Sequence, residues 1–363
     1  MSGLLVDRIE ASAFTIPTRT PESDGTLEWN RTTIIVVELT AGDATGVGYT
    51  YSDSVVAELI NQRLSPFLVG RDPLDIERLW LNLQVQTRNL GWSGIVATAV
   101  SAIDTALWDL KAKLLGLPLC KLLGATREEV PVYGSGGFTS YSTSELVEQL
   151  QNWSATGMRW VKMKIGRDAK ADLARVSAAR KAIGPETGLF VDANGAYERK
   201  QALRQAQYFS ELEVNWFEEP VTSDNIDGLH FLRENLPANI EIAAGEYGYD
   251  LPTFHRLLRG EAVDVLQADV TRCGGVTGFL KVAALSEAYQ VPLSSHCAPT
   301  LHLHPACSVA NFRHAEYFYD HARIESMLFD GSSHPVSGAL RPDLSRSGLG
   351  IEFKRQDAKP FSC

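Results

Sequence analysis

Six polar residues follow short apolar runs along the chain, and their types are those that enzymes use for acid, base and metal chemistry. They are separated by 23 to 28 residues and comprise Lys164, Asp192, Glu218, Glu246, Asp269 and His296. In a (β/α) barrel, the carboxyl ends of all strands meet on one face, where the active site forms. In a doubly wound sheet these ends would not all meet. The spacing therefore predicts a barrel with the six side chains around one mouth.

Three of these residues are carboxylates, Asp192, Glu218 and Glu246, and they repel one another if they converge. At about 4 Å and an effective dielectric constant near 20, each pair costs about 4 kcal/mol. A divalent cation relieves this repulsion, and oxygen ligands without histidine or cysteine suit Mg²⁺. We therefore predict that these three residues bind Mg²⁺. The alternative for any single acid is a helix cap or a solvated loop.

Two lysines, Lys162 and Lys164, alternate with apolar residues in one of the runs. Side chains two residues apart in a strand share a face, and in so apolar a run that face is expected to be the barrel interior. Two buried ammonium groups disfavour each other's charge, which would make a neutral lysine available as a base near neutral pH. The alternative is an exposed edge strand with two solvated lysines.

Asp269 and His296 follow neighbouring runs. A carboxylate beside an imidazole orients the ring and favours its protonated form. Lys164 and His296 would then flank a reacting carbon on opposite faces. Two bases on two faces permit racemisation, whereas a base and an acid permit loss of a β-hydroxyl group as water.

The elements that position these residues follow from the periodicity. From Val130 onward, apolar runs alternate with amphipathic stretches such as residues 169–183 and 197–212, which predicts an α/β fold with a parallel sheet. The earlier part predicts an α+β unit. It has a hairpin of residues 32–38 and 46–51, a long loop at residues 17–29, and a helix at residues 93–115 capped by Ser93.

These motifs resemble the enolase superfamily, specifically the mandelate racemase subgroup of the mandelate racemase/muconate lactonizing enzyme family. The resemblance covers nearly the whole chain and rests on these segments: Lys162-Met-Lys164, Asp192-Ala-Asn194, Glu218-Glu-Pro220, Gly245-Glu246, Asp269 with Gly274-Gly-Val-Thr-Gly278, and Ser294-Ser-His296. It implies a modified (β/α)7β TIM barrel at residues 126–335, an α+β capping domain at residues 1–125, and a C-terminal segment, residues 336–363, that returns to the cap.

The resemblance also implies roles for residues. Asp192, Glu218 and Glu246 would bind Mg²⁺, while Lys162 would stabilise charge on the substrate. Lys164 and the His296–Asp269 pair would act as the acid and base. Glu325 resembles the family's eighth-strand acid, although Glu316 lies close by in the sequence and competes for that role.

The reaction predicted from this resemblance is Mg²⁺-dependent removal of the α-proton of a small carboxylate through an enolate intermediate. Relatives of the muconate-lactonizing type carry a lysine at the end of the sixth strand, where this chain has Asp269. We therefore expect a lyase that dehydrates a sugar acid, an aldonate or aldarate, to a 2-keto-3-deoxy acid. A racemase or epimerase of a 2-hydroxy acid is the alternative, and a non-catalytic metal-binding homologue is another. Residues 17–29 and 49–53 resemble substrate-covering loops, and Trp29, Tyr51 and Asn194 are the candidate substrate contacts.

Composition limits the kinds of binding partner and the cellular compartment that we expect for this chain. The formal net charge of −10 argues against nucleic-acid binding, which needs a basic patch. Charged residues interrupt the most apolar stretch and the N-terminus, so neither a membrane span nor a signal peptide is predicted. Five scattered cysteines fit a reduced, cytoplasmic chain. The resemblance also implies a homo-oligomer, a dimer or an octamer.

Overall fold

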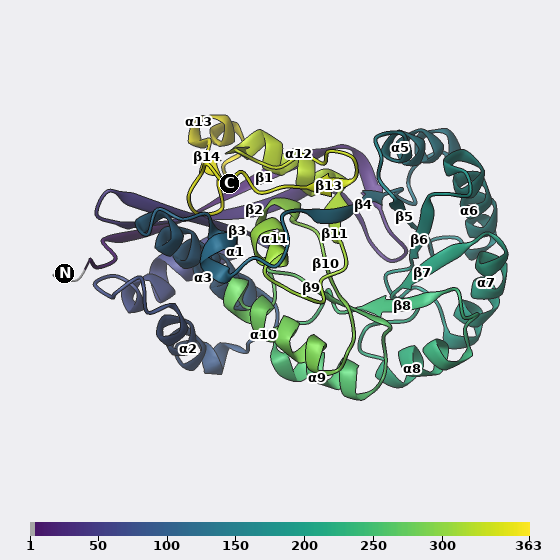
Figure 1. Cartoon of the computed structure of the whole chain (residues 1–363), viewed down its shortest axis with the longest axis horizontal. Helices are drawn as coiled ribbons and strands as arrows, with labels where there is room; N and C mark the ends of the chain where they lie inside the picture. Colours follow the sequence, from purple (N-terminus) through teal and green to yellow (C-terminus); the bar gives the residue numbers. More distant parts are fainter. Residues whose placement is uncertain (1–3) are drawn as a thin grey trace.

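The computed structural model describes residues 4–363, which form a capping domain beside a barrel (Figure 1). The capping domain begins with a three-stranded antiparallel sheet in the order β1-β2-β3. Its strands are β1 (Arg8–Ser23), β2 (Glu28–Ala41) and β3 (Ala44–Tyr51). Its helices are α1 (Val55–Glu58), α2 (Ile76–Thr87), α3 (Ile95–Leu114) and α4 (Leu119–Leu123).

Strand β2 is apolar along its middle because both of its faces are buried. Ile34 and Val36 point into the core that the cap shares with the barrel. Ile35 and Val37 point into the core of the cap itself. The two-residue period of a strand thus sorts neighbouring side chains between two cores, and the sheet is held between the barrel and the cap helices.

The barrel consists of eight parallel strands in the order β10-β9-β8-β7-β6-β5-β4-β11. They are β4 (Val130–Gly136), β5 (Trp160–Lys164), β6 (Gly188–Asp192), β7 (Val214–Glu218), β8 (Glu241–Ala244), β9 (Val265–Ala268), β10 (Leu293–Ser295) and β11 (Ala315–Phe318). A bridge between Leu293 and Phe312 nearly closes the ring between β10 and β11. The predicted fold class, a modified barrel with an α+β cap, is confirmed.

Helices on the outside of the barrel connect its strands. They are α5 (Thr143–Ala155), α6 (Ala169–Ile183), α7 (Arg199–Glu211), α8 (Ile226–Asn235), α9 (Leu251–Arg259), α10 (Gly275–Ala288) and α11 (Pro299–Cys307). The helix predicted at residues 169–183 has the predicted bounds, and the one predicted at residues 197–212 is α7. In both, apolar residues of one face pack against the strands.

Two sequence predictions for the cap are wrong. Residues 17–29 form the far end of a long β1–β2 hairpin rather than a loop, and the pairing shifts register between Pro17 and Glu22. Pro17 still pairs with Arg31, and pairing resumes with Glu22 opposite Trp29, so residues 18–21 lie outside the ladder. They include Pro21, which could not donate a hydrogen bond to it. Helix α3 is preceded by Gly94 rather than capped by Ser93. Gly94 has a φ of 92°, a conformation that favours glycine.

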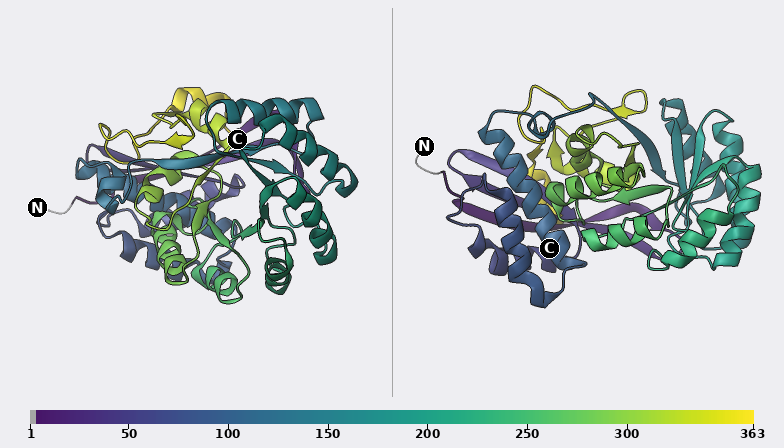
Figure 2. Two further views of the ribbon diagram at one scale, coloured as in Figure 1. Left: turned by 45° about the vertical axis from the view of Figure 1, so that its right-hand side comes forward. Right: turned by 60° about the horizontal axis from the view of Figure 1, so that its bottom comes forward.

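The C-terminal segment follows α12 (Tyr319–Leu328) and lies against the capping domain (Figures 1 and 2). Its short elements are β12 (Phe329–Asp330), β13 (Ala339–Leu340), β14 (Glu352–Phe353) and α13 (Arg355–Ala358). Strand β13 pairs with β4 of the barrel, whereas the backbone N–H of Cys363 donates to Ala13 of β1. The segment therefore joins the two domains.

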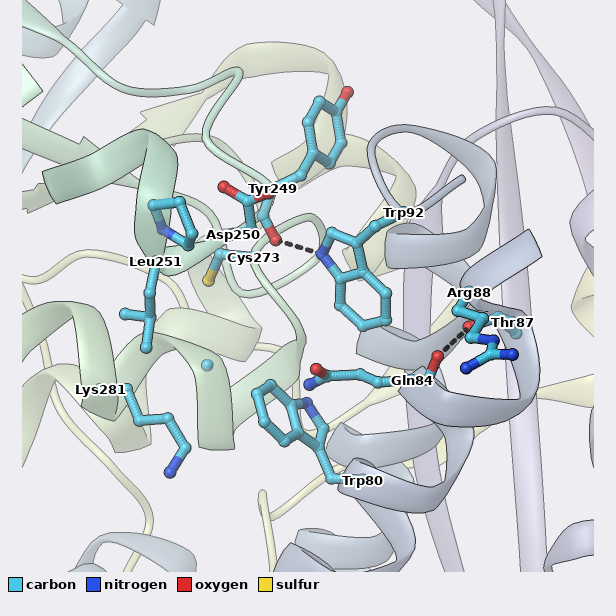
Figure 3. Close-up of a pocket in the computed structure, with 12 residues that line it drawn as sticks. Trp80, Gln84, Thr87, Arg88, Trp92, Tyr249, Asp250, Leu251, Cys273 and Lys281 are labelled. Carbon is cyan, nitrogen blue, oxygen red and sulfur yellow. Dashed lines mark hydrogen bonds between the residues drawn. The ribbon is translucent and has the colours of Figure 1, made fainter. Parts of the chain in front are cut away.

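Two tryptophans of the cap dock it onto the barrel loops. Trp80 donates from Nε1 to the carbonyl of Gly274 at 2.8 Å, and Trp92 donates to the carbonyl of Tyr249 at 2.8 Å. Both rings line a cavity of about 590 Å³ between α2 and the helices α9 and α10 (Figure 3). Gly274 and Tyr249 lie in the loops that follow Asp269 and Glu246, so these contacts hold the two loops against the cap.

Residues 4–363 contain no helix that is both long and apolar enough to cross a membrane. All five cysteines are free thiols, and four of them are buried.

Candidate active site

The structure brings the six regularly spaced residues to one end of the barrel. Lys164, Asp192 and Glu218 end β5, β6 and β7, and the register pairs Lys164 with Asp192 and Asp192 with Glu218. Glu246, Asp269 and His296 come directly after β8, β9 and β10. All six are at most 6% exposed. Parallel pairing in register is the reason that residues distant in sequence meet at one level of the barrel.

Asp192, Glu218 and Glu246 each present one carboxylate oxygen to a common point, and these oxygens lie within 4.8 Å of one another. Burial and the nearby Asp192 raise the pKa of Glu218 well above its usual value. Oε2 of Glu246 is buried and has no hydrogen-bond partner within residues 4–363. A compact set of buried hard oxygen atoms, one of them unpartnered, fits a divalent cation such as Mg²⁺.

Both lysines of β5 are buried against these carboxylates. Lys162 donates from Nζ to Oε1 of Glu218 at 2.6 Å, and Lys164 donates to Oδ2 of Asp192 at 2.5 Å. Burial alone would lower the pKa of each lysine, but the carboxylates raise both above the usual value. This direction is opposite to the sequence-based expectation of a neutral lysine, because attraction to the acids outweighs repulsion between the two ammonium groups. A divalent cation held by the same acids would weaken this attraction and favour the neutral form that a base requires.

His296 and Asp269 form a buried pair on the other side of the cluster. The His296 Nδ1 atom donates to Oδ2 of Asp269 at 2.8 Å. Burial opposes the charge of Asp269, but the hydrogen bond from His296 holds the pKa of this carboxyl below its usual value. The remaining ring nitrogen, Nε2, lies 3.6 Å from Glu246 and 3.2 Å from the thiol of Cys297. Nε2 is thus the atom that can exchange a proton at the mouth.

Glu316, rather than Glu325, is the acid on the eighth strand. Glu325 lies on helix α12, where its carboxylate accepts from the Tyr49 hydroxyl at 2.7 Å and from the backbone of Thr300 at 3.1 Å. Glu316 is on β11, and its Oε1 lies 2.8 Å from Nζ of Lys162. The two structural hydrogen bonds of Glu325 explain its burial beside the barrel, and the placement predicted for it is wrong.

The three candidate substrate contacts line one cavity of about 340 Å³ above the carboxylate cluster, together with Lys164 and His296. The hydroxyl of Tyr51 and Oδ1 of Asn194 are buried there and have no hydrogen-bond partner within the described part of the chain. Trp29 donates its Nε1 to Glu22 and so presents only its ring.

Sequence reasoning missed Arg31 and Cys297, which also line this cavity. Arg31 follows Trp29 by two residues on β2, so the period of a strand places both on one face. That period was a signal for Arg31. The sequence contains no comparable signal for Cys297, which reaches the cavity in a positive-φ conformation after His296.

The tip of the β1–β2 hairpin rests directly on the strand ends that carry Lys164 and Asp192. A Cβ atom on Gly25 would lie 2.4 Å from the carbonyl oxygen of Ala193 and 2.7 Å from that of Ile165. The backbone N–H of Thr139 also donates to Ser23 at 2.8 Å. Glycine at position 25 therefore lets the hairpin close the cavity.

We expect Gly25→Ala to lower kcat/KM by about 10- to 100-fold, since a displacement of about 1 Å in a positioning element can cost this much. Steady-state kinetics would measure the effect, and thermal unfolding would show whether the barrel stays folded. Thr26→Ala, at the exposed next position of the turn, is the control and should retain wild-type kcat/KM. Wild-type kinetics in Gly25→Ala would contradict the close contact.

Comparison with known proteins places this chain in a family. Residues 10–124 match the N-terminal domain of the mandelate racemase / muconate lactonizing enzymes, and residues 145–358 match the enolase C-terminal domain-like family. The chain belongs to the mandelate racemase/muconate lactonizing enzyme family. The resemblance inferred from the motifs is thereby confirmed, and the family is one of enzymes.

Two curated relatives cover nearly the whole chain. The 3,6-anhydro-alpha-L-galactonate cycloisomerase of Streptomyces coelicolor is 32% identical over 97% of this chain and 98% of its own. The L-talarate/galactarate dehydratase of Salmonella typhimurium is 33% identical over 98% of this chain and 90% of its own. A variant of an L-talarate/galactarate dehydratase, crystallised with Mg and L-glucarate, superposes with a TM-score of 0.92 at 30% identity, over 100% of this chain and 93% of its own.

A mandelate racemase/muconate lactonizing enzyme-like protein from Rubrobacter xylanophilus superposes with a TM-score of 0.97 at 50% identity, over 99% of this chain and 100% of its own. The named relatives thus include both a dehydratase and a cycloisomerase.

Proposed function

We propose that this enzyme removes the α-proton of a sugar acid and expels the neighbouring hydroxyl group, yielding a 2-keto-3-deoxy acid and water. The observation that carries the proposal is the order of groups around the barrel. The strands of the three carboxylates lie between Lys164 on β5 and the His296–Asp269 pair after β9 and β10. An acid and a base thus approach one site from opposite sides, which suits removal of the C2 proton by one group and protonation of the leaving hydroxyl group by the other.

Asp192, Glu218 and Glu246 would hold Mg²⁺. When bound, Mg²⁺ supplies a Lewis acid that offsets the charge of these acids and chelates the substrate carboxylate. This choice of metal is supported by the oxygen-only donor set and by the Mg found with the talarate/galactarate dehydratase variant.

The proposed reaction uses the side chains of this chain as follows. One of Lys164 and His296 takes the proton from C2, and the electron pair forms the enolate of the substrate. The other donates a proton to the hydroxyl group on C3, the C–O bond breaks, and water leaves. The resulting enol takes one solvent proton at C3 and becomes the ketone. Lys162, held by Glu218 and Glu316, places positive charge near the developing negative charge.

Tyr51 and Asn194 would donate or accept hydrogen bonds with substrate hydroxyl groups, since their buried polar atoms have no partner within residues 4–363. Trp29 would cover the substrate with its ring. The homo-oligomer expected from the family resemblance stays a prediction.

Incubation with Mg²⁺ and a panel of aldonates and aldarates tests this function. We expect at least one acid to give a 2-keto-3-deoxy product, detected as its semicarbazone, because Lys164 and His296 are both in place. If deuterium from solvent enters only C2 of recovered substrate, dehydration is wrong and racemisation, the alternative that two opposed bases permit, takes its place. If no acid in the panel reacts or exchanges, the proposed function is wrong.

A further inference from the structure

The active-site cavity has a barrel side and a cap side with different chemistry. The barrel side carries Glu246 of the carboxylate cluster with Lys164 and His296, and the cap side carries Trp29, Arg31 and Tyr51. The cavity volume of about 340 Å³ lies within the range of small-molecule sites, about 300–1,000 Å³. A substrate whose carboxylate lies at the cluster therefore has its far end at the cap.

Most basic side chains that line the cavity already have acidic partners. Lys164 lies 2.5 Å from Asp192, and His296 lies 2.8 Å from Asp269. Arg272 lies 3.7 Å from Asp269, and it donates to the backbone carbonyl of Glu246 at 3.0 Å. These groups are held in place on the barrel side.

Two further basic residues lie toward the cap, and they differ in charge. Burial lowers the pKa of His321 to about 3, so its ring is neutral, and it stacks on Tyr51 with 3.4 Å between ring centroids. Arg31 is a permanent cation. It is an exposed residue of the cavity lining, and none of the ion pairs found among residues 4–363 includes it; Glu28 pairs with Arg167 and Asp320 with Arg323 instead.

The acids of the surrounding hairpin are engaged elsewhere. Asp24 accepts hydrogen bonds from the backbone of Thr26 and Leu27 through Oδ1, at 2.6 and 2.7 Å. Glu22 accepts from Trp29 at 3.0 Å. Glu28 pairs with Arg167 at 3.0 Å. None of these contacts satisfies Arg31, so its guanidinium remains available to a ligand.

We infer that Arg31 binds a second acidic group at the far end of the substrate, and that the enzyme acts on aldarates in preference to aldonates. This inference rests on the proposed function and adds the substrate class. An aldarate ends in a carboxylate, which a planar guanidinium binds with two parallel hydrogen bonds, whereas an aldonate ends in a neutral hydroxymethyl group. The names of the relatives include both a dicarboxylate and a galactonate, and so do not decide between the classes.

The test compares six-carbon aldarates with aldonates of the same hydroxyl configuration, using wild-type, Arg31→Met and Arg31→Lys enzymes with Mg²⁺. We expect the wild-type enzyme to have the higher kcat/KM for the aldarate. Arg31→Met should lower the ratio of aldarate to aldonate kcat/KM by about 10- to 100-fold, the effect of losing a hydrogen-bonded charge pair. Arg31→Lys should restore part of the ratio because it keeps the charge. Arg167→Met is the control, because it removes the arginine that pairs with Glu28 of the same hairpin on the exposed surface. It should leave the ratio unchanged.

The outcomes separate this inference from the proposed function. Turnover that favours aldonates, or a ratio that Arg31→Met does not change, would overturn the inference while dehydration stands. If neither class reacts, calorimetry with Mg²⁺-loaded protein still decides, because the inference requires Arg31→Met to weaken aldarate binding more than aldonate binding. Equal weakening of both classes would overturn it.

Discussion

Lys164→Ala should lower kcat by at least about 10²- to 10⁴-fold, the contribution of a well-positioned acid or base. Lys164 lines the cavity, whereas Lys162, the other lysine of β5, does not line it and donates to Glu218 instead. Steady-state kinetics with the best substrate of the panel would measure the loss. Substrate affinity should change less than kcat, since the predicted role is in proton transfer.

Lys170→Ala is the matched control, because Lys170 is an exposed lysine on the helix that follows β5. It should keep wild-type kcat. Turnover close to wild type in Lys164→Ala would remove this lysine from the mechanism. The same experiment on His296→Asn and on the variant that carries both substitutions should show whether the two residues act together, since their losses are then less than additive.

Glu218→Gln should weaken Mg²⁺ binding by at least about 10-fold, because changes even in the groups that support metal ligands cost about 10- to 100-fold in affinity. The substitution keeps the shape of the side chain and removes one of three carboxylates whose oxygens lie within 4.8 Å of one another. Titration calorimetry with Mg²⁺ would measure the change.

Glu325→Gln is a matched control for this prediction and also for the placement of Glu325 on α12. Burial raises the pKa of Glu325 to about 7, and its partners are Tyr49 and Thr300 rather than the cluster. Its Mg²⁺ affinity should therefore equal that of the wild type. An unchanged affinity in Glu218→Gln, or an equal loss in both variants, would contradict the assignment of the ligands.

Periodicity in the sequence was sufficient to predict most of the barrel. The strands β5, β6 and β7 are short, mostly apolar runs that end in a charged residue, so their ends were visible as Lys164, Asp192 and Glu218. Helix α6 was predicted with its observed bounds because its apolar stripe is regular and Gly184 follows it.

The eighth strand could not be predicted in the same way. Helix α11 has only nine residues, so Glu316 follows His296 by 20 residues, which is shorter than the spacing of the earlier units. Strand β11 has four residues and no long apolar run. Glu325 follows His296 by 29 residues, which is closer to the spacing of the earlier units. Its burial reflects its hydrogen bonds with Tyr49 and Thr300 rather than a place on the eighth strand.

The far end of the β1–β2 hairpin was also hidden from the sequence. Its prolines and acids have the composition of a loop, and its strand form depends on tertiary contacts of Ser23 and Gly25 with the barrel. The raised pKa of Lys164 depends on Asp192, which is 28 residues away in sequence and adjacent in space. Such effects follow from the assembled site and from no local pattern.

Turnover of a sugar acid carrying deuterium at C2 tests the central claim most directly, namely that Lys164 and His296 remove a proton from the carbon beside a carboxylate. With Mg²⁺ in ordinary water, the 2-keto-3-deoxy product should contain no deuterium by NMR, and the label should appear in the solvent. Complete retention of the label at C3, together with wild-type turnover in both Lys164→Ala and His296→Asn, would contradict removal of the C2 proton by either residue.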